Sequence, residues 1–183
     1  MLSVRVRQTY LKELGFYTGA IDGIAGRKTR AAYKALQDAY FTRAADKDGI
    51  YGVNTEKLLI NAYRVATTTK NFKLEEFRCK CGTCTGFPSL LDINLLKNLQ
   101  LVRDKFGATT ITSGLRCVKH NKAVGGVSNS RHLVGKAADI KGGYTQTKPQ
   151  RQEVMDYWKS LPKYRYTYAN TTGMGRAVHI DVK

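Results

Sequence analysis

Acidic residues, histidines and long apolar runs are all scarce in this sequence. Only 14 aspartates and glutamates oppose 31 lysines and arginines, so the formal net charge is +17. This balance favours attraction to polyanions, whether nucleic acid, anionic membrane or anionic cell-wall polymer. No apolar stretch approaches the roughly 20 residues of a transmembrane helix, and an integral membrane protein is not expected. The N-terminus, MLSVRVRQTY, lacks the apolar run of a secretory signal peptide, so we expect synthesis in the cytoplasm without a signal peptide.

The basic residues are spread along the chain, and no compact run of lysines and arginines marks a DNA-binding arm. We therefore interpret the charge as a diffuse attraction that does not by itself choose among these polyanions. We expect neither nucleic acid nor membrane as a specific partner. A basic nucleic-acid binder with a cysteine-bound zinc is the alternative, and it predicts tight, salt-dependent DNA binding. Hydrophobic residues make up 42% of the 183 residues, which suits a packed monomer of one or two domains.

Cysteine is confined to the second part of the chain, as Cys79, Cys81, Cys84 and Cys117. The first three are closely spaced and could supply thiolates to a structural zinc, with Cys117 as a fourth ligand. The spacing is not a standard pair of C-x-x-C motifs, however. One disulfide, or four reduced cysteines, remain alternatives from the sequence.

A short motif, D-G-I-x-G-x-x-T, occurs twice in the first third of the chain, at residues 22–29 and 48–55. Its glycines permit tight turns, and a threonine in the first turn suits the start of a helix. Each copy is followed by apolar residues at helical spacing. A further short helix is predicted from Val4 to Leu14, ending at Gly15. The sequence therefore predicts a small all-α domain of three helices over residues 1–65.

This first segment resembles the peptidoglycan-binding domain of bacterial and phage wall hydrolases. The resemblance covers nearly all of residues 1–65 and implies that bacterial peptidoglycan is a partner. The matching residues are Val6-Arg-Gln8, Leu11, Leu14-Gly-Phe16-Tyr-Thr-Gly19, Ile21-Asp-Gly-Ile24, Gly26, Thr29, Ala32 and Leu36-Gln37.

The remaining chain mixes helical and strand patterns. Residues 66–70 are polar and aperiodic, and we predict a linker there. Over residues 71–183, helices are predicted at 88–106 and 149–161 and strands at 109–112, 137–140, 164–168 and 177–182. Tyr164, Tyr166 and Tyr168 alternate, which gives their strand an aromatic face. The mixture predicts an α+β domain with a small antiparallel sheet flanked by helices.

The three histidines, His120, His132 and His179, are the only ones available for a metal or catalytic site. Asp139 follows His132 by seven residues, and Gly135 between them permits a turn that brings both to one place. A catalytic zinc needs three protein ligands and an open position for water. Two neutral imidazoles and one carboxylate would leave such a site with a net charge of +1, which polarises a carbonyl group. Taken singly, each residue also has an ordinary structural role.

The joint pattern S-x-H-x-x-G-x-A-x-D at 130–139, followed by H-x-D at 179–181, resembles a known group of zinc peptidases. The group comprises zinc D-alanyl-D-alanine carboxypeptidases and L-alanyl-D-glutamate endopeptidases, related to lysostaphin and the hedgehog domain. The resemblance covers residues 71–183 and implies one catalytic zinc ion held by His132, Asp139 and His179. Other matching residues are Phe72, Glu76-Phe77, Cys79, Ser113-Gly-Leu-Arg116-Cys117, Asn121, Val124-Gly-Gly126 and Gly173-Met-Gly175-Arg176.

The resemblance also implies roles around the metal. The Arg116 guanidinium would hold a peptide carboxylate or a developing oxyanion, with an ordinary ion pair as the alternative. Ser130 is expected either to bind substrate and orient the site or to cap its turn. His120 matches no ligand position and is expected at the surface.

The general base is where the sequence departs from its relatives. Several of them place an acid three residues before the last histidine, where this chain has Arg176, which cannot accept a proton. The position two before His179 is Ala177, so an H-x-H motif is also absent. Asp181 is the nearest carboxylate, and on a strand it shares a face with His179. Two roles stay open for Asp181, namely catalytic base and orienting partner of a ligand.

The sequence as a whole predicts zinc-dependent hydrolysis of peptide bonds in peptidoglycan. Its two-domain layout resembles a phage or prophage endolysin, made in the host cytoplasm and acting on the cell wall after release. A lytic role favours an endopeptidase over a D-Ala-D-Ala carboxypeptidase. The alternative is a non-catalytic wall-binding protein with an inactive peptidase-like domain, which Arg176 favours.

Overall fold

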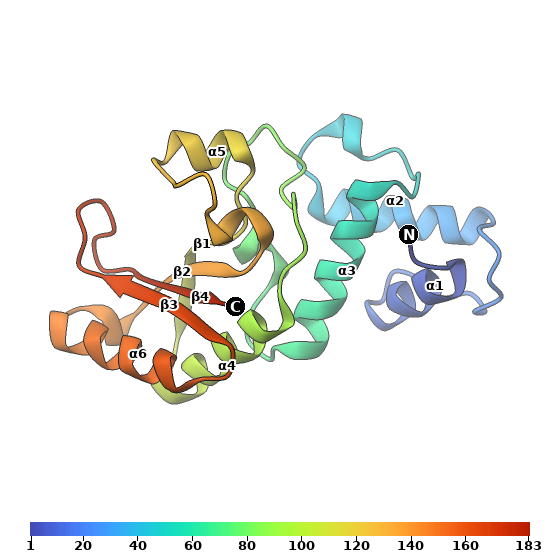
Figure 1. Ribbon diagram of the computed structural model, residues 1–183. Helices are drawn as coiled ribbons and strands as arrows, with labels where there is room; N and C mark the ends of the chain where they lie inside the picture. Colours follow the sequence, from blue (N-terminus) through green and yellow to red (C-terminus); the bar gives the residue numbers. More distant parts are fainter.

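The computed structural model describes residues 1–183, which form a helical N-terminal unit packed beside an α+β unit (Figure 1). The helices are α1 (Val4–Glu13), α2 (Arg27–Tyr40), α3 (Val53–Thr68), α4 (Ile93–Phe106), α5 (Val118–Ala123) and α6 (Lys148–Ser160), with short 3-10 helices η1 (Ala44–Asp46), η2 (Leu74–Phe77), η3 (Arg131–Val134) and η4 (Gly143–Thr145). The strands are β1 (Thr109–Ser113), β2 (Ala137–Gly142), β3 (Tyr164–Ala169) and β4 (Val178–Val182). The predicted classes, three helices followed by an α+β domain, are confirmed.

The first copy of the repeated motif folds around a buried glutamine. The side-chain nitrogen of Gln8, on α1, lies 2.7 Å from Asp22 Oδ1 and 3.1 Å from both the Ile24 carbonyl and Thr29 Oγ1. The backbone N–H of Gly23 donates to Gln8 Oε1 at 2.8 Å. Gly23 has a φ of 80°, a conformation that favours glycine. The motif is therefore a turn whose polar groups are satisfied by one amide side chain.

The second copy repeats this geometry around Gln37, on α2. Its side-chain nitrogen lies 3.0 Å from Asp48 Oδ1, 3.0 Å from the Ile50 carbonyl and 2.9 Å from Thr55 Oγ1. Gly49 N–H donates to Gln37 Oε1 at 2.7 Å. Each helix thus carries the glutamine that organises the turn leading into the next helix.

Helix α3 passes directly from the N-terminal unit to the second unit. The sequence predicted a linker over residues 66–70. In the structure α3 continues through Thr68, so most of that stretch is helical. Its threonine hydroxyls are satisfied along the helix, as Thr67 Oγ1 donates to the Tyr63 carbonyl at 2.7 Å and Thr69 Oγ1 to the Val65 carbonyl at 2.9 Å. Polar composition did not signal the end of the helix, since these bonds keep the hydroxyls within it.

The same helix is tied to the extended segment that precedes α4. Asn61, fully buried, donates to the Ser89 carbonyl at 2.9 Å and accepts from Leu91 N–H at 2.8 Å. Arg64 donates to the Leu91 carbonyl at 2.6 Å. The two units are consequently fixed to each other along α3.

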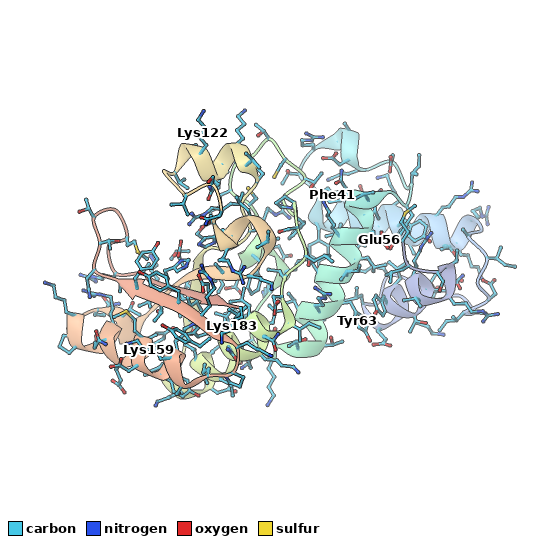
Figure 2. The ribbon with its side chains drawn as sticks, in the orientation of Figure 1. Phe41, Glu56, Tyr63, Lys122, Lys159 and Lys183 are labelled. Carbon is cyan, nitrogen blue, oxygen red and sulfur yellow. The ribbon has the colours of Figure 1, made fainter.

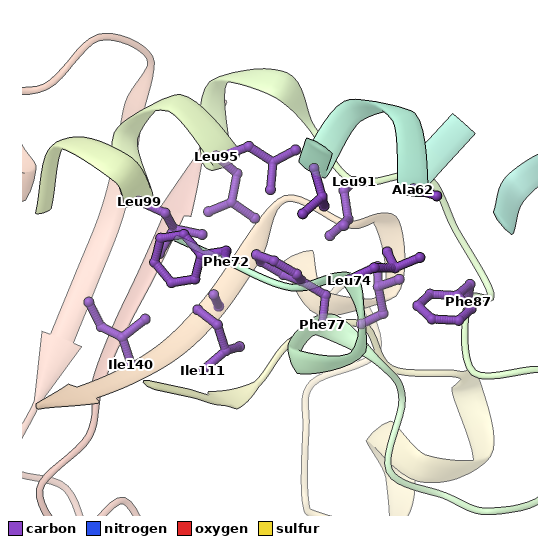
Figure 3. Packing of buried hydrophobic residues seen from close by; sticks show 14 of the residues in the cluster. Ala62, Phe72, Leu74, Phe77, Phe87, Leu91, Leu95, Leu99, Ile111 and Ile140 are labelled. Atoms are coloured by element: carbon purple, nitrogen blue, oxygen red, sulfur yellow. The ribbon is translucent and has the colours of Figure 1, made fainter. Parts of the chain in front are cut away.

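The sheet has four antiparallel strands in the order β1-β2-β4-β3. Helices α4 and α6 cover one face. On that side, Ile111 and Ile140 of the sheet pack with Leu95 and Leu99 of α4 and with Phe72 (Figure 3). Along β4, Val178, Ile180 and Val182 belong to this core. Because side chains alternate along a strand, His179 and Asp181 project from the opposite face.

None of the helices is both long and apolar enough to cross a membrane. Exposed basic side chains extend from several elements, including Lys122 on α5, Lys159 on α6 and Lys183 at the C-terminus (Figure 2). This matches a charge dispersed over the surface.

Candidate metal centre

A tight turn after η3 brings His132 and Asp139 together. The turn is made at Gly135, which has a φ of 70° and ends η3. A Cβ atom there would lie 2.0 Å from the Leu90 carbonyl oxygen, so no larger residue fits without moving the backbone. The chain then enters β2 and presents Asp139 on the face opposite the core.

Strand pairing supplies the third residue of the centre. Asp139 on β2 lies directly opposite His179 on β4 in the antiparallel register. Opposed residues project from the same face with their Cβ atoms about 4.5–5.5 Å apart. The register therefore forces the carboxylate and the imidazole into contact.

The two predicted histidine ligands converge on one oxygen of the third, Asp139. His179 Nδ1 lies 2.8 Å and His132 Nε2 lies 3.4 Å from Asp139 Oδ1. One potential ligand atom from each residue lies within 4.8 Å of the others. His132 is 2% exposed, and its Nε2 is buried without a hydrogen-bond partner. Two imidazoles, one carboxylate and an unpaired buried nitrogen fit a zinc site.

The second nitrogen of each imidazole is also held. His132 Nδ1 lies 2.7 Å from the Gly114 carbonyl oxygen, and His179 Nε2 lies 3.5 Å from Asp181 Oδ2. Asp181 is 2% exposed and receives a hydrogen bond from Arg165 at 2.9 Å. Such contacts fix the orientation of an imidazole that ligates a metal. Asp181 thus lies on the side of His179 away from Asp139, where it can orient the ring.

Electrostatics at the centre favour a bound cation. Burial raises the pKa of the Asp139 carboxyl, but the adjacent imidazoles of His132 and His179 lower it by more, and the net pKa lies well below its ordinary value. For His179, burial lowers the pKa, yet its hydrogen bonds to Asp139 and Asp181 raise it above the ordinary value. Both shifts have the same origin: buried carboxylates that attract a positive charge, whether a proton or a metal ion.

Arg116 lies at the edge of this centre, between two cavities. Its guanidinium donates to Asp139 Oδ2 at 2.7 Å and to Ser113 Oγ at 2.8 Å. The larger cavity, about 850 Å³, runs from Arg116 towards Arg176, and the second, about 560 Å³, is lined by both metal-site histidines. Arg116 and Tyr168 line both. Arg116 thus forms the ion pair that was the alternative to its predicted substrate role, and the same side chain also faces the space available to a substrate.

The other polar residues singled out in the sequence take different places. Ser130 precedes η3 without making a side-chain capping bond, and it lines the second cavity. Arg176 is exposed, lines the larger cavity and donates a hydrogen bond to Gln146. His120 is half-buried on α5, and it lines neither cavity.

Three residues of the centre were given no role at the metal site by the sequence. Tyr168 pairs with His179 in the sheet register, and its ring stacks on the imidazole with centroids 4.6 Å apart. Arg165 is the partner of Asp181, and Ser113 is the partner of Arg116. The alternation of Tyr164, Tyr166 and Tyr168 was a usable signal for an aromatic face, but sequence alone did not reveal which strand that face would meet.

Comparisons with known proteins agree with this arrangement. The peptidase M15 family matches residues 70–181, and a peptidoglycan binding domain family matches residues 2–59. A zinc D-Ala-D-Ala carboxypeptidase from Streptomyces albus G is 35% identical over 150 residues, covering 75% of this chain. The chain spans 58% of the length of that relative. With its two-histidine, one-aspartate centre lying within the matched region, the chain belongs to the peptidase M15 family.

Proposed function

We propose that the protein hydrolyses peptide bonds of bacterial peptidoglycan with one zinc ion held by His132, Asp139 and His179. The observation that carries the proposal is the convergence of His132 Nε2 and His179 Nδ1 on Asp139 Oδ1. The relative from Streptomyces albus G, a zinc D-Ala-D-Ala carboxypeptidase, supports both the metal and the substrate class. The match to a peptidoglycan binding domain supports the same polymer as the ligand of α1–α3.

A zinc ion held by His132, Asp139 and His179 would act as a Lewis acid, polarising a carbonyl group and lowering the pKa of water to about 7. The protein's own residues do the positioning. Gly114 and Asp181 orient the two imidazoles through their remote nitrogens. Arg116, fixed by Ser113, presents its guanidinium where a substrate carboxylate or a developing oxyanion binds.

Tyr168 is placed to donate a hydrogen bond to the substrate. It lines both cavities and stacks on His179. Burial, followed by the nearby charge of Asp139, raises the pKa of its hydroxyl above the ordinary value. The phenol therefore keeps its proton at neutral pH and can act as a donor.

Within this activity we favour cleavage inside the peptide over trimming of its end. The two cavities share Arg116, Gly125, Gly126 and Tyr168, so the available space continues on both sides of Arg116. A groove of this kind accommodates chain on both sides of the scissile bond. Endopeptidase cleavage also suits a lytic role, that of an endolysin made in a host cytoplasm and acting on the wall after release.

The test is to incubate purified peptidoglycan with the zinc-loaded protein and identify the products by mass spectrometry. New peptide fragments indicate an endopeptidase, whereas loss of a single terminal alanine indicates a carboxypeptidase. His132→Ala serves as the metal-site control and should abolish either product. Arg116→Lys should lower kcat/KM by roughly 10²–10³-fold, because the lysine ammonium cannot make the bidentate hydrogen bonds of the guanidinium.

A non-catalytic wall-binding protein is the second candidate, and Arg176 is the observation that favours it. This residue occupies the position where several relatives carry an acid. That candidate predicts retention of the protein on peptidoglycan with no bond cleaved at any zinc concentration. Turnover by the wild type, lost in His132→Ala, would exclude it.

A further inference from the structure

The four cysteines form a second cluster of metal-binding groups, separate from the histidine centre. The Sγ atoms of Cys79, Cys81, Cys84 and Cys117 all lie within 4.8 Å of one another, and none of the four is in a disulfide. We propose that these cysteines bind a second zinc ion with a structural role.

The cluster is assembled from two segments that are far apart in sequence. Cys79, Cys81 and Cys84 lie in the loop after η2, and Cys117 immediately precedes α5. The loop is folded tightly: Gly82 and Gly86 have φ values of 68° and 90°, and Cys79 N–H donates to the Gly86 carbonyl at 2.8 Å. This turn directs the three side chains of one short loop towards a common point.

Every sulfur in the cluster accepts a hydrogen bond from the backbone. Cys81 accepts from the N–H groups of Thr83 and Cys84, at 3.4 and 3.2 Å. Cys84 accepts from Gly86 at 3.3 Å, Cys79 from Cys117 at 3.3 Å and Cys117 from His120 at 3.4 Å. Backbone donors around a sulfur stabilise the thiolate that zinc requires. Because all four sulfurs accept such bonds, each is in an environment that favours the thiolate form needed to bind a metal.

The geometry favours zinc over disulfides. Four thiolates bind zinc at about 2.3 Å in a tetrahedron, which places each sulfur about 3.8 Å from the other three. All four sulfurs lie within 4.8 Å of one another, as four ligands of one ion must, whereas two disulfides would need only two close pairs. Zinc and four thiolates carry a net charge of −2, and the thiol protons leave to solvent on binding. Arg43 donates to the Thr83 carbonyl at 2.9 Å beside the cluster, and its guanidinium is also paired with Asp46 at 2.8 Å.

The cluster would clamp a segment that positions the histidine centre. Cys117 adjoins Arg116, and Gly114 nearby supplies the carbonyl that contacts His132. Two residues before Cys79, the Phe77 carbonyl accepts a hydrogen bond from Leu115 N–H at 2.8 Å. A Cβ atom on Gly114 would lie 2.6 Å from Phe77 Cα, so these segments are already in backbone contact. A zinc ion between Cys79 and Cys117 locks that contact beside the catalytic groups.

Metal analysis of the purified full-length protein tests the proposal. The wild type should contain about two zinc ions per chain, one from each cluster. The double variant Cys81→Ser/Cys84→Ser and the variant His132→Ala/His179→Ala should each contain about one. Thr85→Ala, in the same loop, keeps all four sulfurs and should retain both ions. A wild-type content of one zinc, unchanged by the double cysteine variant, would overturn the proposal.

A second set of measurements needs no cysteine variant and remains decisive if that variant does not fold. Titration of the wild type with a mercurial reagent should consume four thiols and release about one zinc, detected with a chromogenic chelator. Cobalt loading should give a sulfur-to-cobalt charge-transfer band that persists in His132→Ala/His179→Ala. An intact mass lowered by the hydrogens lost in disulfides, or four free thiols with no zinc released, contradicts a zinc site.

Discussion

Asp181 contacts the metal centre through His179. Its Oδ2 lies 3.5 Å from His179 Nε2, while the opposite ring nitrogen faces Asp139. The carboxylate is buried and paired with Arg165. Of the two roles that the sequence left open, this placement supports the orienting role.

Asp181→Asn tests that assignment. If the carboxylate orients His179, the variant should bind zinc about 10–100-fold more weakly, because contacts to a ligand's remote nitrogen contribute on this scale. At saturating zinc it should recover most of the wild-type turnover. Zinc affinity by chelator competition and turnover at high zinc measure the two effects separately. Unchanged zinc affinity with turnover lost at all zinc concentrations would assign Asp181 as the base instead.

Residues of the centre differ in how far the sequence could predict them. The set of His132, Asp139 and His179 followed from local features, namely a glycine turn and strand alternation, together with a family pattern. The role of Arg165 was not predicted, because it depends on which strands are neighbours, and strand pairing leaves no mark on local spacing. The bond between Ser113 and Arg116 joins residues three apart. It was missed because a turn does not reveal from spacing alone which side chains bond within it.

Among the elements, the two repeated turns were recognised from sequence before the contacts that stabilise them were known. The sequence placed Gln8 and Gln37 in the resemblance but assigned them no contacts. In the structure each is at most 1% exposed and satisfies an aspartate, a threonine and backbone groups of its turn. The spacing predicted turns followed by helices, which is correct. It did not reveal the glutamine at the centre, since that residue lies on the preceding helix.

Gln37→Glu should destabilise the protein by about 1–3 kcal/mol at neutral pH. The change removes the donor to Asp48, Ile50 and Thr55 and places a carboxylate against the Asp48 carboxylate. Urea unfolding followed by circular dichroism measures the loss. Gln152→Glu is the matched control, because exposed Gln152 also contacts an aspartate, Asp156, at 2.9 Å. Its cost should be only a few tenths of a kcal/mol, and equal losses in the two variants would contradict the role of Gln37.

The same turn predicts a pH dependence. Hydrogen bonds from the Ile50 backbone and then from Gln37 lower the pKa of Asp48. A carboxyl whose folded-state pKa is lowered stabilises the protein above its unfolded pKa, about 3.9 for aspartate, and that contribution disappears as the pH falls through the folded-state value. The stability difference between wild type and Asp48→Asn should therefore shrink between neutral pH and about pH 3. Urea titrations at both pH values test this, and a constant difference would contradict it.

At the scale of the whole molecule, the two family segments share one core. Buried apolar residues from Leu11 in α1 to Val182 in β4 belong to a single packed cluster. Helix α3 contributes Leu58, Leu59 and Val65 to it. The sequence predicted two domains and a polar linker, but it had no means of showing that α3 would pack on both sides.

We expect a single cooperative unfolding transition in calorimetry. Asn61→Ala should lower the Tm of that one transition, at a cost of about 1–3 kcal/mol, because it leaves the half-buried Ser89 carbonyl and the buried Leu91 N–H without their partner. Asn54→Ala, on the exposed start of the same helix, should have a much smaller effect. Two separate transitions, only one of them sensitive to Asn61→Ala, would show that the units unfold independently.

The net charge of +17 predicts that wall binding has a salt-sensitive part and a salt-resistant part. Dispersed surface charges attract anionic wall polymers over a screening length of about 10 Å at 0.1 M salt, and this length shortens as salt is added. Raising the salt should weaken binding to intact walls several-fold but leave binding to walls stripped of anionic polymers nearly unchanged. The triple variant Lys122→Ala/Lys159→Ala/Lys183→Ala is altered at exposed positions away from the metal centre and lowers the net charge from +17 to +14. It should weaken the salt-sensitive part modestly and leave the salt-resistant part unchanged. Sedimentation with purified walls measures both parts, and equal salt dependence on stripped and intact walls would contradict a contribution from the anionic polymers.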